Sequence, residues 1–113
     1  MAATKAELLQ GTLDLLILKT LTAGPMHGFA IARWIRETTN DALQLEEGTL
    51  YPALYRMERK GWIASRWRQT ENKRKARYYS LTASGKKQLR LESKGWLDMS
   101  KAIGRIMRAA QSS

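Results

Sequence analysis

The first apolar run of the chain restricts its fold most strongly. Between Leu8 and Leu21, leucine and isoleucine fall on most sides of a helix, so this helix must lie at the centre of a core or pair with a second chain. Thr4 and Glu7 have capping-box spacing, which predicts the start of the helix. Gly24-Pro25 predicts its end, because proline lacks an amide hydrogen and disfavours helix in the preceding residue. With 113 residues, the chain is long enough for one core and one domain.

The segments after this helix alternate between helical and extended patterns. A second helix is expected over 27–39, and an Asn-Asp pair should end it. Leu43 and Leu45 alternate with polar residues, which predicts a short strand over 42–46. A third helix should run from Glu47 to Lys60 and stop at Gly61, a residue type common at helix ends.

The C-terminal half of the chain contains a predicted hairpin and a long helix. Two β-rich runs, 62–69 and 77–81, flank a polar, basic segment, which predicts an antiparallel pair. A closing helix should cover about 82–110. The expected fold class is therefore mainly α with a small β-hairpin (α+β). This order of elements is that of a winged helix-turn-helix over residues 1–82, which is expected to be a DNA-binding domain, followed by a C-terminal helix over 83–113, which is expected to be a dimerisation helix.

Positive charge is concentrated in the second half of the chain. The formal net charge is +10, and residues 56–113 carry 16 basic side chains against 4 acidic ones. This separation predicts a cationic face, whose usual partners are nucleic-acid phosphates or an anionic membrane. A basic surface that serves only solubility is the alternative, but solubility does not require the two signs to separate along the chain.

The third predicted helix has an apolar face formed by Leu50, Ala53, Leu54 and Met57. Its other sides offer hydroxyl and guanidinium groups, which suit a DNA major groove. Arginines there could bind guanine in a bidentate manner or bind phosphates, and the tyrosines could instead be half-buried packing residues. The candidate DNA-binding residues of this helix are Thr49, Tyr51, Tyr55, Arg56 and Arg59.

The predicted hairpin tip carries Lys73, Arg74, Lys75 and Arg77, four positive charges within five positions. We expect these long side chains to bind the DNA backbone or the adjacent minor groove through charge rather than base sequence. A solvated loop is the alternative in the absence of DNA.

The closing helix carries an apolar stripe with a seven-residue repeat, the pattern of a helix-pairing seam. A domain of this size can cover such a stripe only with its own first helix or with a second copy of the chain. We favour the second copy, because two identical DNA-reading units match a palindromic site in double-stranded DNA. The predicted dimerisation residues are Leu89, Trp96, Met99, Ile103, Ile106 and Met107, with Ala110 extending the repeat.

Other functional classes receive little support from the sequence. Cysteine is absent and His27 is the sole histidine, so no nucleophile with a base, no metal site and no cofactor site is expected, and the chain is predicted not to be an enzyme. The lack of cysteine favours the reducing cytoplasm. We expect neither a signal peptide nor a membrane span, and no membrane partner.

Five sequence blocks resemble the PadR family of transcriptional regulators in its short form with a single C-terminal helix, over about Leu8 to Met107. The blocks are Gly11-Thr12-Leu13-Asp14-Leu15-Leu16-Ile17-Leu18, Gly24-Pro25-Met26-His27-Gly28-Phe29-Ala30-Ile31-Ala32, Gly48-Thr49-Leu50-Tyr51-Pro52-Ala53-Leu54-Tyr55-Arg56-Met57-Glu58, Lys60-Gly61-Trp62-Ile63 and Arg77-Tyr78-Tyr79-Ser80-Leu81-Thr82-Ala83-Ser84-Gly85. The resemblance implies a homodimeric winged-helix protein that binds operator DNA, usually as a repressor released by a small molecule. It also implies that His27 begins the second helix, where capping or packing is expected rather than catalysis.

The resemblance also implies an effector site and shows two departures from the family pattern. Some relatives are thought to bind planar effectors between their closing helices, near a tryptophan that corresponds to Trp96. Leu15, Met99 and Ile103 are then the expected lining, although Trp96 could simply fill the dimer core. The hairpin tip has Asn72-Lys73-Arg74 where many relatives have a glycine, and glycines at 95 and 104 interrupt the last helix.

One alternative function stays open at this point. The chain could be a basic adaptor whose winged helix binds protein partners and contacts nucleic acid only non-specifically.

Overall fold

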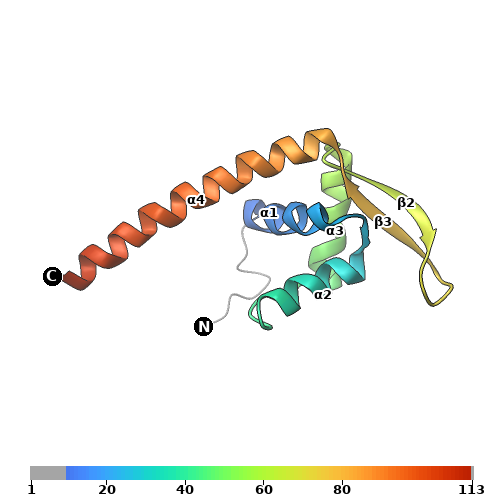
Figure 1. Ribbon diagram of the computed structural model, residues 1–113, viewed down its shortest axis with the longest axis horizontal. Coiled ribbons are helices and arrows are strands. Elements are labelled where there is room, and N and C mark those ends of the chain that lie inside the picture. Colours follow the sequence, from blue (N-terminus) through green and yellow to red (C-terminus); the bar gives the residue numbers. More distant parts are fainter. Residues whose placement is uncertain (1–9, 113) are drawn as a thin grey trace.

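The computed structural model describes residues 10–112, and the predicted capping box at Thr4 and Glu7 lies outside this range. Figure 1 shows a helical body with a β-hairpin at one end and a long helix that extends away at the other. The elements in chain order are α1 (Gln10–Thr20), the 3₁₀ turn η2 (Leu21–Ala23), β1 (Met26–His27), α2 (Gly28–Thr38), α3 (Glu47–Arg59), β2 (Ile63–Gln69), β3 (Lys75–Leu81) and α4 (Ala83–Ser112).

The core lies between α1, α2 and α3 and extends to the base of the hairpin. Ile17 and Leu18 of α1 are fully buried in it, as the apolar run of this helix predicts. The predicted core face of α3 is confirmed. The buried apolar side chains are Leu13, Ile17, Leu18, Leu21, Ile31, Ile35, Leu45, Leu50, Ala53, Leu54, Met57, Ile63 and Tyr79.

The predicted second and third helices are present within one residue of their expected ends. His27 caps α2, because its Nδ1 accepts a hydrogen bond of 3.2 Å from the backbone amide of Ala30. This confirms the predicted capping by the histidine. Gly61 follows α3 with a φ of 80°, a left-handed conformation that other residues rarely adopt.

The strand predicted over 42–46 is wrong. This segment is an irregular connection between α2 and α3, entered through Asn40 and Asp41, whose φ values of 51° and 67° turn the chain sharply. Leu45 is buried in the core, and Leu43 is partly buried against it. Packing of a connecting segment therefore produces the alternation that resembles a strand. The third strand is instead the two-residue β1, too short to show any periodicity.

The sheet is antiparallel in the order β1-β3-β2. Ser65 faces Tyr79 and Trp67 faces Arg77 across β2 and β3, whereas Arg66 and His27 both face Tyr78. Successive residues point to opposite faces, so Tyr79 is buried on the side of the core and Tyr78 lies on the outer side. Lys73 adopts a φ of 61° at the tip, a left-handed conformation that favours glycine.

Helix α4 begins where predicted and is continuous through Gly95 and Gly104. Its start is fixed by Thr82, whose Oγ1 accepts a hydrogen bond of 3.0 Å from the amide of Gly85. The part of α4 nearest the sheet packs on α1, and the remainder projects beyond the body, giving extents of 60 × 29 × 21 Å (Figure 1). No helix among residues 10–112 has an apolar stretch long enough to cross a membrane.

Candidate nucleic-acid interface

The side of α3 away from the core presents most of the residues predicted to bind DNA. Tyr51, Tyr55 and Arg59 are exposed, and Thr49 is half-buried in the first turn. The guanidinium carbon of Arg59 lies 5.7 Å from the centre of the Tyr55 ring, close enough for a cation–π contact. These two side chains therefore form one unit on the exposed face, and the guanidinium keeps its hydrogen-bond donors available.

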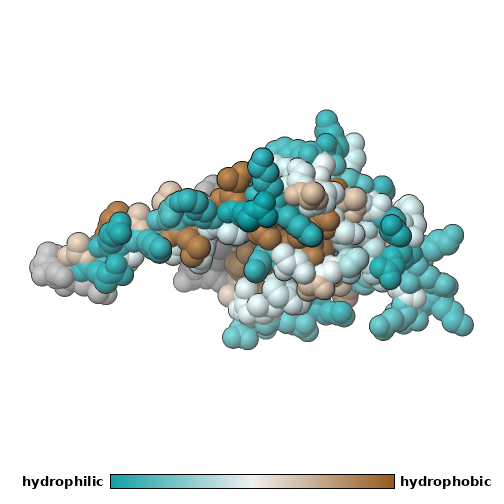
Figure 2. Space-filling model, turned by 45° about the horizontal axis from the view of Figure 1, so that its top comes forward, coloured by the Kyte–Doolittle hydropathy of each residue, from teal (hydrophilic) through white to brown (hydrophobic). Residues whose placement is uncertain are grey.

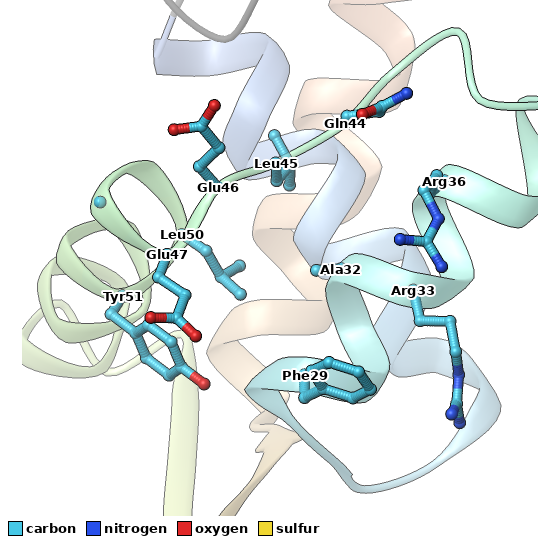
Figure 3. Close-up of a pocket in the computed structure, with 11 residues that line it drawn as sticks. Phe29, Ala32, Arg33, Arg36, Gln44, Leu45, Glu46, Glu47, Leu50 and Tyr51 are labelled. Atoms are coloured by element: carbon cyan, nitrogen blue, oxygen red, sulfur yellow. The ribbon is translucent and has the colours of Figure 1, made fainter.

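Tyr51 is held against α2 rather than extending freely into solvent. A Cβ atom at Gly28 would lie 2.7 Å from the Tyr51 hydroxyl oxygen, so the absence of a side chain at Gly28 makes room for the ring. Figure 3 shows Tyr51 beside Glu47 on α3, facing the helix that carries Phe29. Burial, and then the nearby Glu47 carboxylate, raises the pKa of Tyr51. The hydroxyl thus stays protonated at neutral pH and can donate a hydrogen bond.

Arg56 is paired with an acidic residue of α1. Its two terminal nitrogens lie 3.0 Å and 2.6 Å from the two carboxylate oxygens of Asp14 in α1. Hydrogen bonding to Asp14 raises the pKa of Arg56. Sequence reasoning did not predict Asp14 as the partner of Arg56, although an acidic residue within an apolar helix is a signal that could have found it.

The hairpin places its four predicted cations in two environments. Lys73, Arg74 and Lys75 are exposed at the tip. Arg77 lies further down, where its Nε donates a hydrogen bond of 2.8 Å to Ser65 Oγ and a terminal nitrogen lies 3.8 Å from a Glu58 carboxylate oxygen. Ser65 Oγ in turn donates to Glu58 at 2.7 Å. Arg77 therefore links the hairpin to the end of α3, and the tip carries the free charge.

A groove of about 720 Å³ runs between the start of α2, Tyr51 and the hairpin. The groove therefore lies between the two groups of residues predicted to bind DNA, those of α3 and those of the hairpin. Phe29, Arg33 and Trp67 also line it, and all three are exposed. Arg33 lies 5.7 Å from the centre of the Phe29 ring. Arg33 is not among the candidate DNA-binding residues predicted from the sequence, because only the folded chain places α2 opposite the hairpin.

A second hollow, of about 490 Å³, lies between α2 and the start of α3 and is shown in Figure 3. Arg33 and Arg36 border it from α2, and Glu46 and Glu47 border it from the α3 side. Among residues 10–112, no three histidine, cysteine, aspartate or glutamate side chains come together to hold a metal ion.

The projecting part of α4 carries the predicted apolar stripe on its surface. Trp96 is 54% exposed and Ile103 is 50% exposed, and Figure 2 shows hydrophobic groups along this arm. Leu89 differs from the rest, because it is partly buried against the core of its own chain. Leu15, the remaining residue of the predicted effector site, is half-buried on α1. The exposed stripe residues are Trp96, Met99, Ile103, Ile106 and Met107, with Leu91 and Leu97 nearby.

A three-helix body, a β-hairpin wing and exposed cations on both α3 and the wing define a winged-helix protein of the DNA-binding class. Comparison with known proteins then identifies the family. Residues 17–91 match the model of the transcriptional regulator PadR-like family, so the chain belongs to that family. Its members are transcriptional regulators rather than enzymes.

Solved structures agree with this assignment. A PadR family transcription regulator from Clostridium difficile R20291 is 33% identical, with a TM-score of 0.74 over 84% of this chain and 97% of that one. A transcriptional regulator from Clostridium thermocellum is 32% identical, with a TM-score of 0.77 over 85% and 93%. A Streptococcus mutans UA159 protein is 26% identical, with a TM-score of 0.82 over 96% and 94%. The protein is thus a PadR-family transcriptional regulator, which implies regulation through DNA binding.

Proposed function

We propose that the protein is a cytoplasmic, homodimeric repressor that binds a palindromic operator and is released by a small planar effector. The observation that carries this proposal is the joint placement of two surfaces: exposed cations on α3 and the wing at one end, and an uncovered apolar stripe on α4 at the other. The first suits DNA and the second suits a partner helix. The seven-residue spacing of Trp96 and Ile103 favours a second copy of the same helix as that partner.

In this arrangement α3 enters the major groove and the wing tip lies along the backbone. Thr49, Tyr51, Tyr55 and Arg59 face the DNA from α3, with Lys73, Arg74 and Lys75 at the tip. Two α3 helices about 34 Å apart would contact successive major grooves, which gives the operator its inverted repeat. A planar effector would stack on Trp96 between the two α4 helices, next to Leu15, Met99 and Ile103, and its binding would change the separation of the α3 helices.

The proposal is tested by selecting tight-binding sequences from a pool of random duplexes. We expect the selected sites to contain an inverted repeat with half-sites one helical turn apart. We also expect them to bind at least 1,000-fold more tightly than random duplex, the lower end of the range for specific DNA-binding proteins. Equal binding to every duplex would contradict the proposal and support the adaptor alternative.

Replacing Arg59 with alanine should lower affinity for the selected site about tenfold and leave binding to random duplex within about twofold. The reason is that an arginine contact with a base edge contributes roughly 1–3 kcal/mol to specificity. Fluorescence anisotropy at fixed salt measures both affinities. Arg36→Ala, on α2, is the matched control for removal of a charge. An equal loss on both duplexes would show that Arg59 binds only phosphate.

Replacing Arg74 or Lys75 with alanine should weaken binding to all duplexes alike. Each phosphate contact that is lost should reduce the slope of log affinity against log salt by about 0.9, because fewer counterions are released. Affinities measured at four or five salt concentrations give this slope. Lys101→Ala, on the projecting part of α4, should leave the slope unchanged. An unaltered slope in both wing variants would remove the tip from the interface.

A further inference from the structure

The ion pair between Asp14 and Arg56 joins two helices that are 42 residues apart in the chain. Asp14 is only 3% exposed, and both of its carboxylate oxygens accept hydrogen bonds from the arginine. The Arg56 side chain is 27% exposed. A planar guanidinium that binds a carboxylate through two parallel hydrogen bonds has a narrowly defined orientation. The position of Arg56, and with it the middle of α3, is therefore fixed relative to α1.

The apolar contacts of α3 with the core do not define its orientation as narrowly. Leu50, Ala53, Leu54 and Met57 are buried in the core, and such apolar packing is non-directional. At the end of α3, Glu58 accepts a hydrogen bond from Ser65 and lies close to Arg77, but this link leads to the hairpin. The Asp14–Arg56 pair is thus the directional link between α3 and α1.

The orientation of α3 decides which side chains face outward. Side chains extend roughly 5–6 Å from the axis of a helix, so a rotation of about 10° displaces Tyr55 and Arg59 sideways by about 1 Å. Contacts with base edges depend on such displacements, whereas contacts between long cations and phosphates tolerate them. A residue that sets this rotation would therefore affect specificity more than overall affinity.

We propose that Asp14 and Arg56 are a positioning pair that sets the rotation of α3 for sequence-specific DNA binding, and that Arg56 does not itself contact DNA. This inference rests on the proposed DNA-binding function. It assigns to Asp14, a residue of α1 inside the body, a role in specificity, and it replaces the expectation that Arg56 binds guanine or phosphate.

The decisive variant is Asp14→Asn, which removes a charge from α1 and leaves Arg56 with its full positive charge. Affinities for the duplex selected with the unaltered protein, and for random duplex, are measured across a range of salt concentrations. We expect the ratio of the two affinities to fall at least tenfold and the salt slope to stay unchanged. If Arg56 were a DNA contact, freeing it from Asp14 would maintain or strengthen binding.

A second variant and a control separate positioning from loss of structure. Arg56→Lys keeps the charge but cannot form two parallel hydrogen bonds, and it should lower the affinity ratio as Asp14→Asn does. The double variant Asp14→Asn with Arg56→Lys should lower the affinity ratio no more than either single variant does, because each single substitution already removes the same pair. Glu37→Gln, at an exposed position of α2, changes the net charge as Asp14→Asn does and should leave the ratio unchanged. Circular dichroism shows whether each variant is folded at the temperature of the binding measurements. If Asp14→Asn does not fold, the affinity ratio of Arg56→Lys tests the positioning role.

The outcomes distinguish this inference from the proposed function. Retention of the affinity ratio in folded Asp14→Asn or Arg56→Lys would overturn the positioning role. So would a loss of about 0.9 in the salt slope of Arg56→Gln, because it would place Arg56 on a phosphate. If the unaltered protein itself prefers no duplex, the proposed function fails first.

Discussion

Aspartate at both Trp96 and Ile103 should convert a dimer of this protein into a folded monomer. Both side chains are about half exposed on the projecting part of α4, and two-fold symmetry doubles every change in a helix seam. Full burial of a large apolar side chain contributes roughly 1.5–3 kcal/mol, and a dimer would bury the exposed half of each, so four lost side chains remove about 3–6 kcal/mol. That loss corresponds to about 10²- to 10⁴-fold in the dimer dissociation constant.

Sedimentation velocity at micromolar concentration measures the mass directly. Lys101→Gln with Arg105→Gln is the matched control, because it also lowers the net charge by two but lies on the opposite side of α4 by helical spacing. The control should remain a dimer. The fold should survive in the seam variant, because the part of α4 that packs on α1 is unchanged. An unchanged mass in the seam variant would reject the proposed dimer, and affinity for the inverted repeat should fall together with the mass.

Alanine at Gly85 should lower the free energy of unfolding by about 1–3 kcal/mol, the range for overpacking a close contact. A Cβ atom there would lie 1.9 Å from the carbonyl oxygen of Trp62. That oxygen also accepts hydrogen bonds of 3.1 Å from both the backbone amide and the hydroxyl of Thr82, so it is not free to move. The clash therefore displaces the start of α4 from the end of α3 and the base of the hairpin.

The clash and helix propensity predict opposite changes in stability for Gly85→Ala, because helix propensity alone favours alanine over glycine by about 1 kcal/mol. Urea denaturation followed by circular dichroism gives the free energy of unfolding. Gly48→Ala is the control, since no atom lies within 4 Å of a Cβ built at that position of α3. It should be neutral or slightly stabilising. A stabilised Gly85→Ala would mean that α4 docks less closely on Trp62 than the structure indicates.

Local patterns predicted most of the fold. Leu50, Ala53, Leu54 and Met57 recur at helical spacing, and all four are buried. The strand predicted over 42–46 is the exception. A two-residue alternation arises whenever a segment lies along a core, and it becomes a strand only where a neighbouring strand offers free hydrogen-bonding groups. Met26 and His27 have such a neighbour in β3.

The candidate interface was predicted less completely. Tyr51, Arg59 and the tip cations were identified because residue type and local position suggested them. The ion pairs of Arg56 with Asp14 and of Arg77 with Glu58 were not predicted. The partners of a charged side chain depend on which distant segments the fold brings within 4 Å.

The sequence by itself determined where the helices and hairpin lie, which faces are apolar and which half of the chain is basic. These properties follow from the spacing of residue types along a helix or strand of known period. Only the tertiary structure decided which cations stay free for DNA, which strand completes the sheet, and that the stripe on α4 is left uncovered from Trp96 onward. Each of these depends on contacts between segments far apart in the chain, and the local spacing of residue types does not specify such contacts.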